Sequence, residues 1–371
     1  MLDNRDIEYM QLALKLAQRG IGTVEPNPAV GCVIVKNDKI IGKGWHKKFG
    51  GQHAEINAIE DCKKRGNNPE GATIYVTLEP CCHFGKTPPC TEAIIAAKPA
   101  KVVAATIDPS KHNNGKGIEQ LKKAGIDVQT GVCKKEAELL NAPFMKFATT
   151  GKCWVILKWA QSIDGKMTST SGQRWISCEK SRKDAHRLRR RVQGVLVGIN
   201  TVIADDPLLT PRPSKDKKPV RIVLDSFLKT PLDCKLLTTA KKFPTLIAAG
   251  RQTIKSKSRK AKEIVDKGAE LLAVPAKQGK LDLKFLLKEL VNRGIAQLLV
   301  EGGAKVIISF LKEQLADEIC VYIASKILGA QGNVNISESM TEVTKAAGLH
   351  YVDIKRLGDD VCINGLLKTV D

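Results

Sequence analysis

Residues 73–90 read TIYVTLEPCCHFGKTPPC, and this stretch decides the fold of the first half of the chain. Its β-branched and aromatic opening predicts a buried strand over residues 73–78. The segment 79–90, rich in Pro, Cys and Gly, is expected to form a loop that leads into a helix over 91–97. A strand, a cysteine-bearing loop and a helix in this order indicate an α/β domain.

The flanking sequence extends this pattern on both sides. Helices are expected over 8–19 and 53–65 and near 117–124, with strands at 30–35, 40–41, 102–106 and 126–129. Strands that alternate with helices at this spacing predict a three-layer α/β/α domain over residues 1–148.

A second α/β series follows over residues 152–371, after a junction expected at 147–151. Strands are expected at 155–159, 194–199, 220–225, 244–249, 270–274, 296–300 and 319–325, and helices near 179–192, 255–267, 282–292 and 304–313. The last forty residues read as strands with turns, around 350–354 and 360–369.

The composition favours a soluble, cytoplasmic protein with an anionic partner. No apolar run reaches the roughly 20 residues of a membrane span, and the N-terminal residues lack the apolar core of a signal peptide. The net charge of +21 suits nucleic acid, a membrane surface or a phosphorylated small molecule. No aromatic residue lies in the basic runs 187–191 and 251–262, so we expect solvated helical faces there and no nucleic-acid partner.

His53, Cys81 and Cys90 form a candidate metal site. In a chain of this size without a secretion signal, the eleven cysteines are expected to be thiols or metal ligands rather than disulfides. One imidazole and two thiolates are donors that zinc prefers, and three protein ligands leave a fourth position for water. Glu55 follows His53 by two residues and offers the carboxylate that hydrolytic deamination needs to carry a proton from the water to the departing amine. This grouping is the signature of zinc deaminases.

Two alternatives stay open at this point. A closed structural zinc site would result if Cys82 or His83 supplied a fourth ligand, and the chain would then be a non-catalytic zinc module fused to a nucleotide-binding domain. The other alternative is a nucleic-acid base deaminase with an added basic domain. That class carries a C-x-x-C motif, whereas eight residues separate Cys81 from Cys90 here.

The second half carries a weaker signal at Glu301-Gly302-Gly303. The predicted strand 296–300 ends there and the helix over 304–313 begins. A glycine pair at such a turn exposes backbone N–H groups at a helix N-terminus, which suits a phosphate. The G-x-G-x-x-G fingerprint of dinucleotide-binding domains is absent from this turn.

Motifs along nearly the whole chain resemble the bifunctional riboflavin-biosynthesis deaminase–reductase family. Those similar to its deaminase half are PNPAVGCVIV (26–35), HAE (53–55) and TLEPCCHFGKTPPC (77–90). Those similar to its reductase half are SIDGK (162–166), GQRWIS (172–177), NTVIADDPLLTPR (200–212), VLDS (223–226) and VEGGA (300–304). The resemblance implies a cytidine-deaminase-like N-terminal domain and a C-terminal domain like dihydrofolate reductase.

The resemblance also implies roles for single residues. In the first domain it implies zinc ligation by His53, Cys81 and Cys90, proton transfer by Glu55 and a place near the substrate for Asn27. In the second it implies NADPH contacts for Trp175, Thr201, Asp205, Ser226, Gly303, Ala304 and Lys305, and substrate contacts for Arg189, Leu209, Arg212 and Glu301. Two positions depart from other members, since Cys82 and Gln173 stand where relatives can carry Ser.

The implied chemistry has two steps. Zinc-dependent deamination of a diaminopyrimidinone ribosylamino 5′-phosphate releases ammonia, and NADPH then reduces the ribosyl group of the resulting aminouracil to ribityl. Arg189 and Arg212 fit a phosphate clamp, because a guanidinium offers paired donors to phosphate oxygens. The family implies a homo-oligomer, either a dimer or a tetramer, that acts on phosphorylated small molecules.

Overall fold

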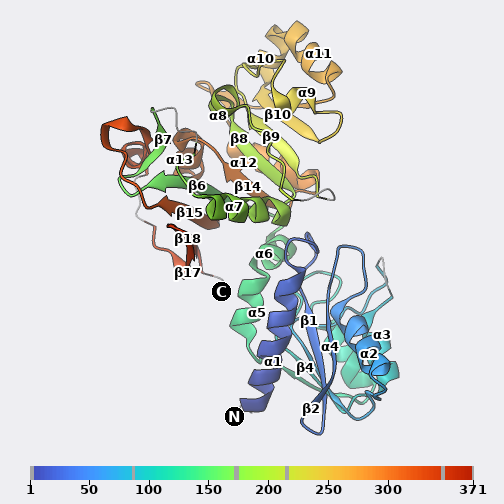
Figure 1. Ribbon diagram of the computed structural model, residues 1–371. Coiled ribbons are helices and arrows are strands. Elements are labelled where there is room, and N and C mark those ends of the chain that lie inside the picture. Colours follow the sequence, from blue (N-terminus) through green and yellow to red (C-terminus); the bar gives the residue numbers. More distant parts are fainter. Residues whose placement is uncertain (1–3, 86–87, 171–174, 214–216, 344–346, 370–371) are drawn as a thin grey trace. The chain divides into compact units, whose positions relative to one another are not determined.

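The computed structural model describes residues 4–85, 88–170, 175–213, 217–343 and 347–369, and it separates into two compact units (Figure 1). The first unit extends to Gly151, and the second runs from Lys152 to Thr369. Each unit is built around one β-sheet covered by helices. No helix in the described part of the chain is long and apolar enough to cross a membrane.

The first unit is a three-layer α/β/α structure, as the sequence predicts. Its sheet has the order β2-β1-β3-β4-β5, in which β1 is antiparallel to β2 and β3, and β3, β4 and β5 are parallel. The strands are β1 (Gly31–Lys36), β2 (Lys39–Trp45), β3 (Thr73–Val76), β4 (Lys101–Ala104) and β5 (Asp127–Thr130). The helices are α1 (Asn4–Ala17), α2 (Ala54–Lys64), α3 (Cys90–Ala97), α4 (Lys116–Lys123), α5 (Lys134–Leu140) and α6 (Ala142–Thr150).

Alternate residues of the central strands separate the two faces of this sheet. Ile34 and Ile74 point into a core shared with α2, α3 and α4. Val33 and Tyr75, their neighbours in the chain, point into the opposite core shared with α1 and α5. The period of two along each strand therefore sorts the apolar residues between two buried layers.

The end of the first unit differs from expectation. The two units divide directly after Gly151, at the end of the predicted junction 147–151, but residues 147–150 form the last turn of α6 and Gly151 ends that helix with φ +64°. Pro143 supplies a helix-start signal, and a left-handed glycine is a common helix stop. Helices α5 and α6 were not predicted.

The second unit is built around a nine-stranded sheet of order β11-β10-β9-β8-β14-β6-β15-β18-β17. All neighbouring strands are parallel except that β18 is antiparallel to both of its neighbours, β15 and β17. The strands are β6 (Trp154–Ser162), β8 (Gly194–Gly198), β9 (Val220–Leu224), β10 (Thr245–Gly250), β11 (Glu270–Val274), β14 (Gln297–Glu301), β15 (Glu318–Ala324), β17 (His350–Leu357) and β18 (Asp360–Leu366).

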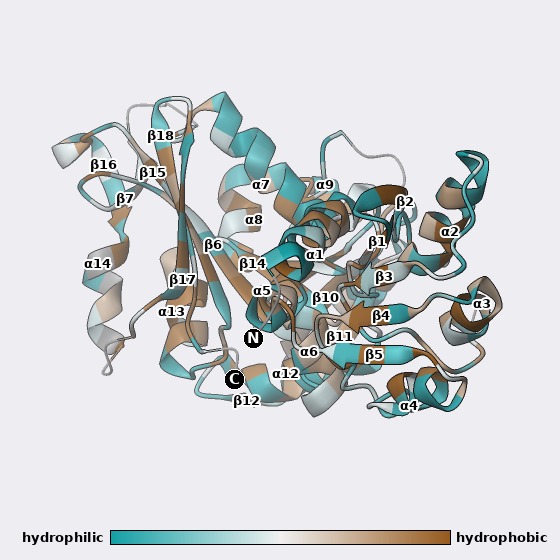
Figure 2. Ribbon diagram, turned by 90° about the horizontal axis from the view of Figure 1, so that it is seen from below, coloured by the Kyte–Doolittle hydropathy of each residue, from teal (hydrophilic) through white to brown (hydrophobic). Residues whose placement is uncertain are grey.

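Helices cover this sheet on both faces. They are α7 (Glu179–Arg191), α8 (Ile199–Asp205), α9 (Lys235–Thr238), α10 (Arg251–Ser256), α11 (Ser258–Asp266), α12 (Leu283–Asn292), α13 (Ala304–Lys312) and α14 (Ile336–Ser339). The main core joins Val155, Leu157 and Leu298 to α12 and α13. Helix α7 lies over the other face, and its mostly polar surface is teal in Figure 2.

Two local features of the second unit were not predicted. The single helix expected at 255–267 is two helices, α10 and α11, that meet at Lys257. Two small sheets pair β7 (Lys166–Ser169) with β16 (Gly332–Asn335) and β12 (Ala276–Lys277) with β13 (Lys280–Leu281). The strands of both small sheets are too short to show a clear alternation of apolar and polar residues, so the sequence pattern did not predict them.

Candidate active sites

The structure brings His53, Cys81 and Cys90 together in the first unit. Their candidate ligand atoms all lie within 4.8 Å of one another. His53 Nδ1 is 3.2 Å from Cys90 Sγ and 3.5 Å from Cys81 Sγ. Within the described ranges no fourth His, Cys, Asp or Glu joins the group. One nitrogen and two sulfur donors fit zinc, with a position left for water.

Glycines in β2 fix the start of α2, where His53 and Glu55 lie. A Cβ on Gly44 would come within 2.3 Å of the Ala54 carbonyl oxygen, and one on Gly42 within 2.5 Å of the Ala58 carbonyl oxygen. Helix α2 therefore packs directly on the strand backbone, with His53 immediately before its first residue.

Glu55 is 4% exposed, in the first turn of α2. Burial is the largest influence on its carboxyl group, and it raises the pKa to about 7 against the opposing effect of His53. The carboxyl group also interacts with the Cys90 thiol. A buried carboxyl beside the candidate ligands is well placed to hold and release a proton.

The two candidate thiolate ligands differ in their protonation. Contact with Cys90 and then His53 lowers the pKa of the Cys81 thiol to about 4, although burial opposes this. The Cys90 backbone N–H donates to the same sulfur at 3.3 Å. Contact with Cys81 and burial raise the pKa of Cys90 above its ordinary value.

Cys82 and His83 turn away from the three candidate ligands. The Cys82 thiol donates to Asn113 Oδ1 at 3.4 Å, and its backbone N–H donates to the same oxygen at 3.1 Å. His83 Nδ1 lies 3.2 Å from that oxygen as well. These contacts leave neither residue in the ligand group, so the closed site with a fourth protein ligand finds no support.

The carboxylate of Glu79 holds the loop that carries Cys81. It is 3% exposed and accepts hydrogen bonds from the backbone N–H groups of Asp108, Gly115 and Gly117, at 3.1, 2.9 and 2.8 Å. A Cβ on Gly117 would lie 2.2 Å from the Pro80 carbonyl oxygen. The cysteine loop is thereby fixed against the segment before α4.

His46 is a further residue of this site that the sequence analysis missed. Its ring centroid is 5.3 Å from that of His53, it is 3% exposed, and its Nε2 atom lacks a hydrogen-bond partner in the described structure. The sequence signal that could have identified this residue was a histidine at the end of a strand, seven residues before His53. Asn27 lies in the loop before β1, and Asn141 anchors that loop through two hydrogen bonds to the Ala29 backbone.

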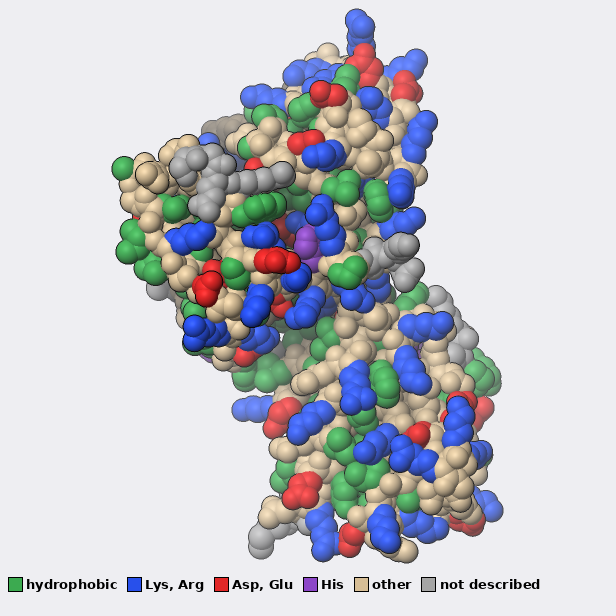
Figure 3. Space-filling model, in the orientation of Figure 1, with side chains coloured by type: hydrophobic (Ala, Val, Ile, Leu, Met, Phe, Trp, Pro, Cys, Tyr) green, Lys and Arg blue, Asp and Glu red, His purple; other side chains and the backbone are tan. Residues whose placement is uncertain are grey.

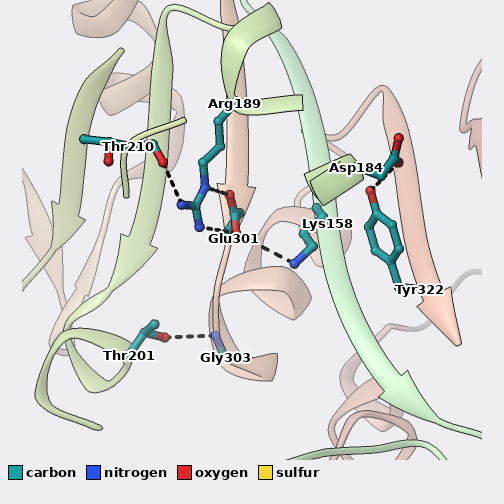
Figure 4. Close-up of polar contacts among 8 residues, drawn as sticks. All are labelled: Lys158, Asp184, Arg189, Thr201, Thr210, Glu301, Gly303 and Tyr322. Atoms are coloured by element: carbon teal, nitrogen blue, oxygen red, sulfur yellow. Dashed lines mark hydrogen bonds and ion pairs between the residues drawn. The ribbon is translucent and has the colours of Figure 1, made fainter. Parts of the chain in front are cut away.

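In the second unit, Arg189 and Glu301 form a two-pronged ion pair (Figure 4). Arg189 Nε and Nη2 donate to the Glu301 carboxylate at 2.6 and 3.0 Å, and Nη1 donates to the Thr210 carbonyl oxygen at 3.2 Å. Burial alone would raise the pKa of Glu301, but Arg189 and Lys158 outweigh it and lower the pKa to about 2.

The turn after Glu301 exposes the N-terminus of α13. Gly302 adopts φ +140°, and a Cβ at this position would lie 3.2 Å from Thr201 Oγ1. The Gly303 N–H donates to Thr201 Oγ1 at 3.3 Å, and the space beside the Gly303 Cα is open (Figure 4). Ala304 is buried and Lys305 is exposed. Of the residues for which the resemblance implies cofactor contacts, Thr201 and Gly303 are therefore in direct contact with each other.

The other implied residues lie at the ends of strands and helices. Trp175 is 52% exposed and stacks on the Arg182 guanidinium at 5.2 Å, Asp205 ends α8, and Ser226 follows β9. Arg212 is exposed, whereas Leu209 is buried, with 2% of the whole residue exposed. Gln173 lies outside the described residues.

Lys158 and His186 were missed in this second site. Lys158 Nζ is 3.8 Å from Glu301 Oε2, across the β6–β14 pairing that places the two residues in register. Burial, Arg189 and Arg212 lower the pKa of His186 to about 4, which places this histidine near both arginines. Neither residue stands in a motif that the sequence analysis used.

Lys and Arg side chains are dispersed over the surface that Figure 3 shows rather than gathered in one patch. In the basic run 251–262, Arg251, Lys255, Lys257 and Lys262 are exposed. Arg259 is also exposed, and it pairs with Glu263 on the same helix. This distribution agrees with the solvated face expected for 251–262. The same expectation is wrong for 187–191, where Arg189 and Arg191 are partly buried and pair with Glu301 and Glu318.

Comparisons with known proteins match both units. Residues 3–106 match the cytidine and deoxycytidylate deaminase zinc-binding region, and residues 153–363 match the RibD C-terminal domain. The riboflavin biosynthesis protein RibD of Aquifex aeolicus is 43% identical, over 98% of this chain and 99% of that protein. RibD of Escherichia coli is 37% identical, over 97% of this chain and 99% of that protein.

Solved structures agree with these matches. Acinetobacter baumannii RibD superposes with a TM-score of 0.81 at 35% identity, and 98% of each chain is covered. The Thermotoga maritima diaminohydroxyphosphoribosylaminopyrimidine deaminase/5-amino-6-(5-phosphoribosylamino)uracil reductase superposes with a TM-score of 0.80 at 32% identity, over 97% of this chain and 98% of that chain.

Fold and site together define a two-domain enzyme, in which a deaminase of the zinc-binding class is joined to a reductase. The chain belongs to the RibD family of riboflavin biosynthesis proteins. It is a bifunctional enzyme of riboflavin biosynthesis that acts on small molecules. This assignment is supported over both alternative functions, the nucleic-acid base deaminase and the non-catalytic zinc module.

Proposed function

We propose that the first unit deaminates a diaminopyrimidinone ribosylamino 5′-phosphate by hydrolysis, with one zinc ion held by His53, Cys81 and Cys90. The observation that carries this proposal is the convergence of these three donors beside the buried carboxyl group of Glu55. The name of the Thermotoga maritima protein, which is similar over nearly the whole chain, supports the substrate class.

Each residue of the first site has a distinct task in this proposal. When bound, zinc supplies a Lewis acid that lets a water molecule ionise near neutral pH. Glu55 would accept one proton from the water and deliver it to the ring nitrogen, and would then carry the second proton, from the added hydroxyl group, to the amine as the carbon–nitrogen bond breaks. Asn27 contacts the substrate from the anchored loop before β1.

In the second unit, we propose that NADPH reduces the ribosyl group of the aminouracil product to ribityl. Trp175, Thr201, Asp205, Ser226 and the segment 303–305 would bind the cofactor, which supplies the hydride. Arg189, Leu209, Arg212 and Glu301 would contact the substrate. The open N-terminus of α13 at Gly303 supports a phosphate seat, and Arg212 is free to meet the substrate phosphate because it is exposed.

The setting of the enzyme is also proposed. We expect a cytoplasmic homo-oligomer, either a dimer or a tetramer, that acts on phosphorylated small molecules and not on nucleic acid. The dispersed basic side chains and the 4% aromatic content support small-molecule partners, because a nucleic-acid groove gathers both kinds of residue.

The deaminase is tested with the full chain by metal analysis and by ammonia release from the ribosylaminopyrimidine phosphate. Glu55→Gln should keep one zinc per chain and lose at least about a hundredfold in turnover. Glu60→Gln on the same helix, which removes a carboxylate bonded to Gln52, is the matched control. Full turnover by Glu55→Gln would show that Glu55 does not carry the proton.

The reductase is tested by following NADPH oxidation when the deaminated substrate is added. Arg212→Ala should raise the KM for that substrate more than the KM for NADPH, because the lost guanidinium would have bound the substrate phosphate. The reverse order would place Arg212 at the cofactor instead.

A further inference from the structure

Five side chains form a continuous line across one face of the second unit's sheet, and both ends of the line lie on α7 (Figure 4). The Tyr322 hydroxyl donates to Asp184 Oδ2 at 2.8 Å, and Lys158 Nζ lies 5.4 Å from the centroid of the Tyr322 ring. Lys158 in turn lies 3.8 Å from the Glu301 carboxylate, which Arg189 binds with two hydrogen bonds.

The register of the sheet creates this arrangement. In the parallel pairing of β6 with β15, Lys158 is opposite Cys320, and Tyr322 is opposite Ala160. Lys158 and Tyr322 are therefore diagonal neighbours on the same face. Tyr322 is 1% exposed and packs in a small apolar cluster with Cys320 and Ala185.

The ammonium group of Lys158 needs more than Glu301 to fix its direction. At 3.8 Å the contact with Glu301 is an ion pair that is longer than a hydrogen bond. A lysine side chain has several rotatable bonds, so a single loose contact leaves its ammonium group free to move. The face of a shielded aromatic ring attracts a cation, and the Lys158 side chain is 17% exposed. The ring therefore supplies a second restraint.

We propose that Tyr322 is a positioning residue of the reductase site, which holds the Lys158 ammonium group beside Glu301. The hydroxyl group, through Asp184, ties this arrangement to the helix that carries Arg189. The inference rests on the proposed reductase function. It assigns to a fully buried tyrosine a part in holding the Lys158 cation next to Glu301, which would contact the substrate.

Three substitutions separate the ring from the hydroxyl. Tyr322→Leu removes both, and we expect kcat/KM for the aminouracil substrate to fall about tenfold while the KM for NADPH stays the same. Tyr322→Phe keeps the ring and should rescue kcat/KM to within about threefold of the wild type. Asp184→Asn keeps an acceptor for the hydroxyl group and should resemble Tyr322→Phe.

A double-mutant cycle distinguishes positioning from a purely structural role. If Tyr322 acts through Lys158, Lys158→Met should cost much less in the Tyr322→Leu background than in the wild type. A structural role would give additive losses, or unchanged kcat/KM for the folded fraction. Tyr75→Phe is the matched control, because this buried tyrosine donates to Asp6 at 2.6 Å in the first unit.

The readouts also separate this inference from the proposed function. Ammonia release by the same chains reports a folded first unit, and urea unfolding of the four cycle members measures the Lys158–Tyr322 contact without catalysis. Should Tyr322→Leu not fold, Tyr322→Met is the second variant with the same expectation, since its flexible side chain fills gaps.

A wild type without NADPH oxidation refutes the proposed reductase, and the positioning role falls with it. An active wild type with equal kcat/KM in Tyr322→Leu or Tyr322→Met, or with an additive cycle, overturns the positioning role alone.

Discussion

Arg189 donates two hydrogen bonds to the carboxylate of Glu301, and the side chains are 16% and 9% exposed, respectively. The pair joins α7 to the carboxyl end of β14. A guanidinium fork that meets a carboxylate in this way fixes the orientation of both groups. Local stability and the substrate contact proposed for Arg189 and Glu301 therefore depend on the same two side chains.

Glu301→Gln should destabilise the second unit by about 3 kcal/mol, because it leaves the Arg189 charge largely buried without its partner. Reductase kcat/KM should fall as well, whereas ammonia release by the first unit should not change. Urea unfolding and the two activity assays measure these effects. An unchanged unfolding midpoint would show that water already screens the pair.

The same carboxylate predicts a pH dependence of stability. Its pKa is lowered from 4.5 to about 2 in the folded protein. A folded-state pKa below the unfolded value adds stability above about pH 4.5 that is lost as the pH falls to about 2. Across this range, the wild type should lose about 3 kcal/mol more than Glu301→Gln in urea unfolding. Parallel pH curves for the two proteins would contradict the assignment.

The two neighbouring cysteines of the first site should behave differently. Cys81→Ser should lose most of the bound zinc and the ammonia release, since it removes a thiolate donor. Cys82→Ser should keep both, because the Cys82 thiol faces Asn113 and a hydroxyl group can donate to the same oxygen. Metal analysis of the purified chains decides between them. Equal zinc loss in both variants would mean that Cys82 also binds the metal.

Arg221 gives a prediction about stability alone. Its side chain is fully buried and donates to Leu236, Phe243 and Thr239, at 2.9, 3.0 and 2.8 Å. Arg221→Met would remove these three hydrogen bonds from a buried site, although the Thr245 hydroxyl still donates to the Phe243 oxygen at 2.9 Å, and it should cost at least about 3 kcal/mol in urea unfolding. Arg293→Met removes two surface ion pairs instead, with Glu270 and Glu289, and should cost less than about 1 kcal/mol. Similar losses in the two variants would refute this difference.

Short motifs in the sequence revealed the candidate metal ligands, whereas side-chain contacts that arise from the register of paired strands were missed. His53, Cys81 and Cys90 were found because their types and spacing fit one metal, and the structure places them together. Lys158 and Tyr322 were missed because they meet only through the pairing of β6 with β15, which no local pattern specifies.

Helix boundaries show the same limit. The helix over 53–65 was predicted almost to the residue, because its apolar positions recur at helical spacing. Residues 147–151 were predicted to be the junction, and the units divide after Gly151, but the packing of Phe144 and Met145 on the first unit's core extends α6 through residues 147–150. Tertiary contacts overrode local propensity there.

The bonds of Glu79 have a practical consequence for protein engineering. Its side chain joins the cysteine segment to backbone groups nearly thirty to forty residues further along the chain. A designer who transplants the Pro-Cys-Cys motif into another scaffold would have to bring along the segment before α4 and the first turn of α4, which contains Gly117. Without that segment, no hydrogen bonds to Glu79 would hold the transplanted cysteines in place.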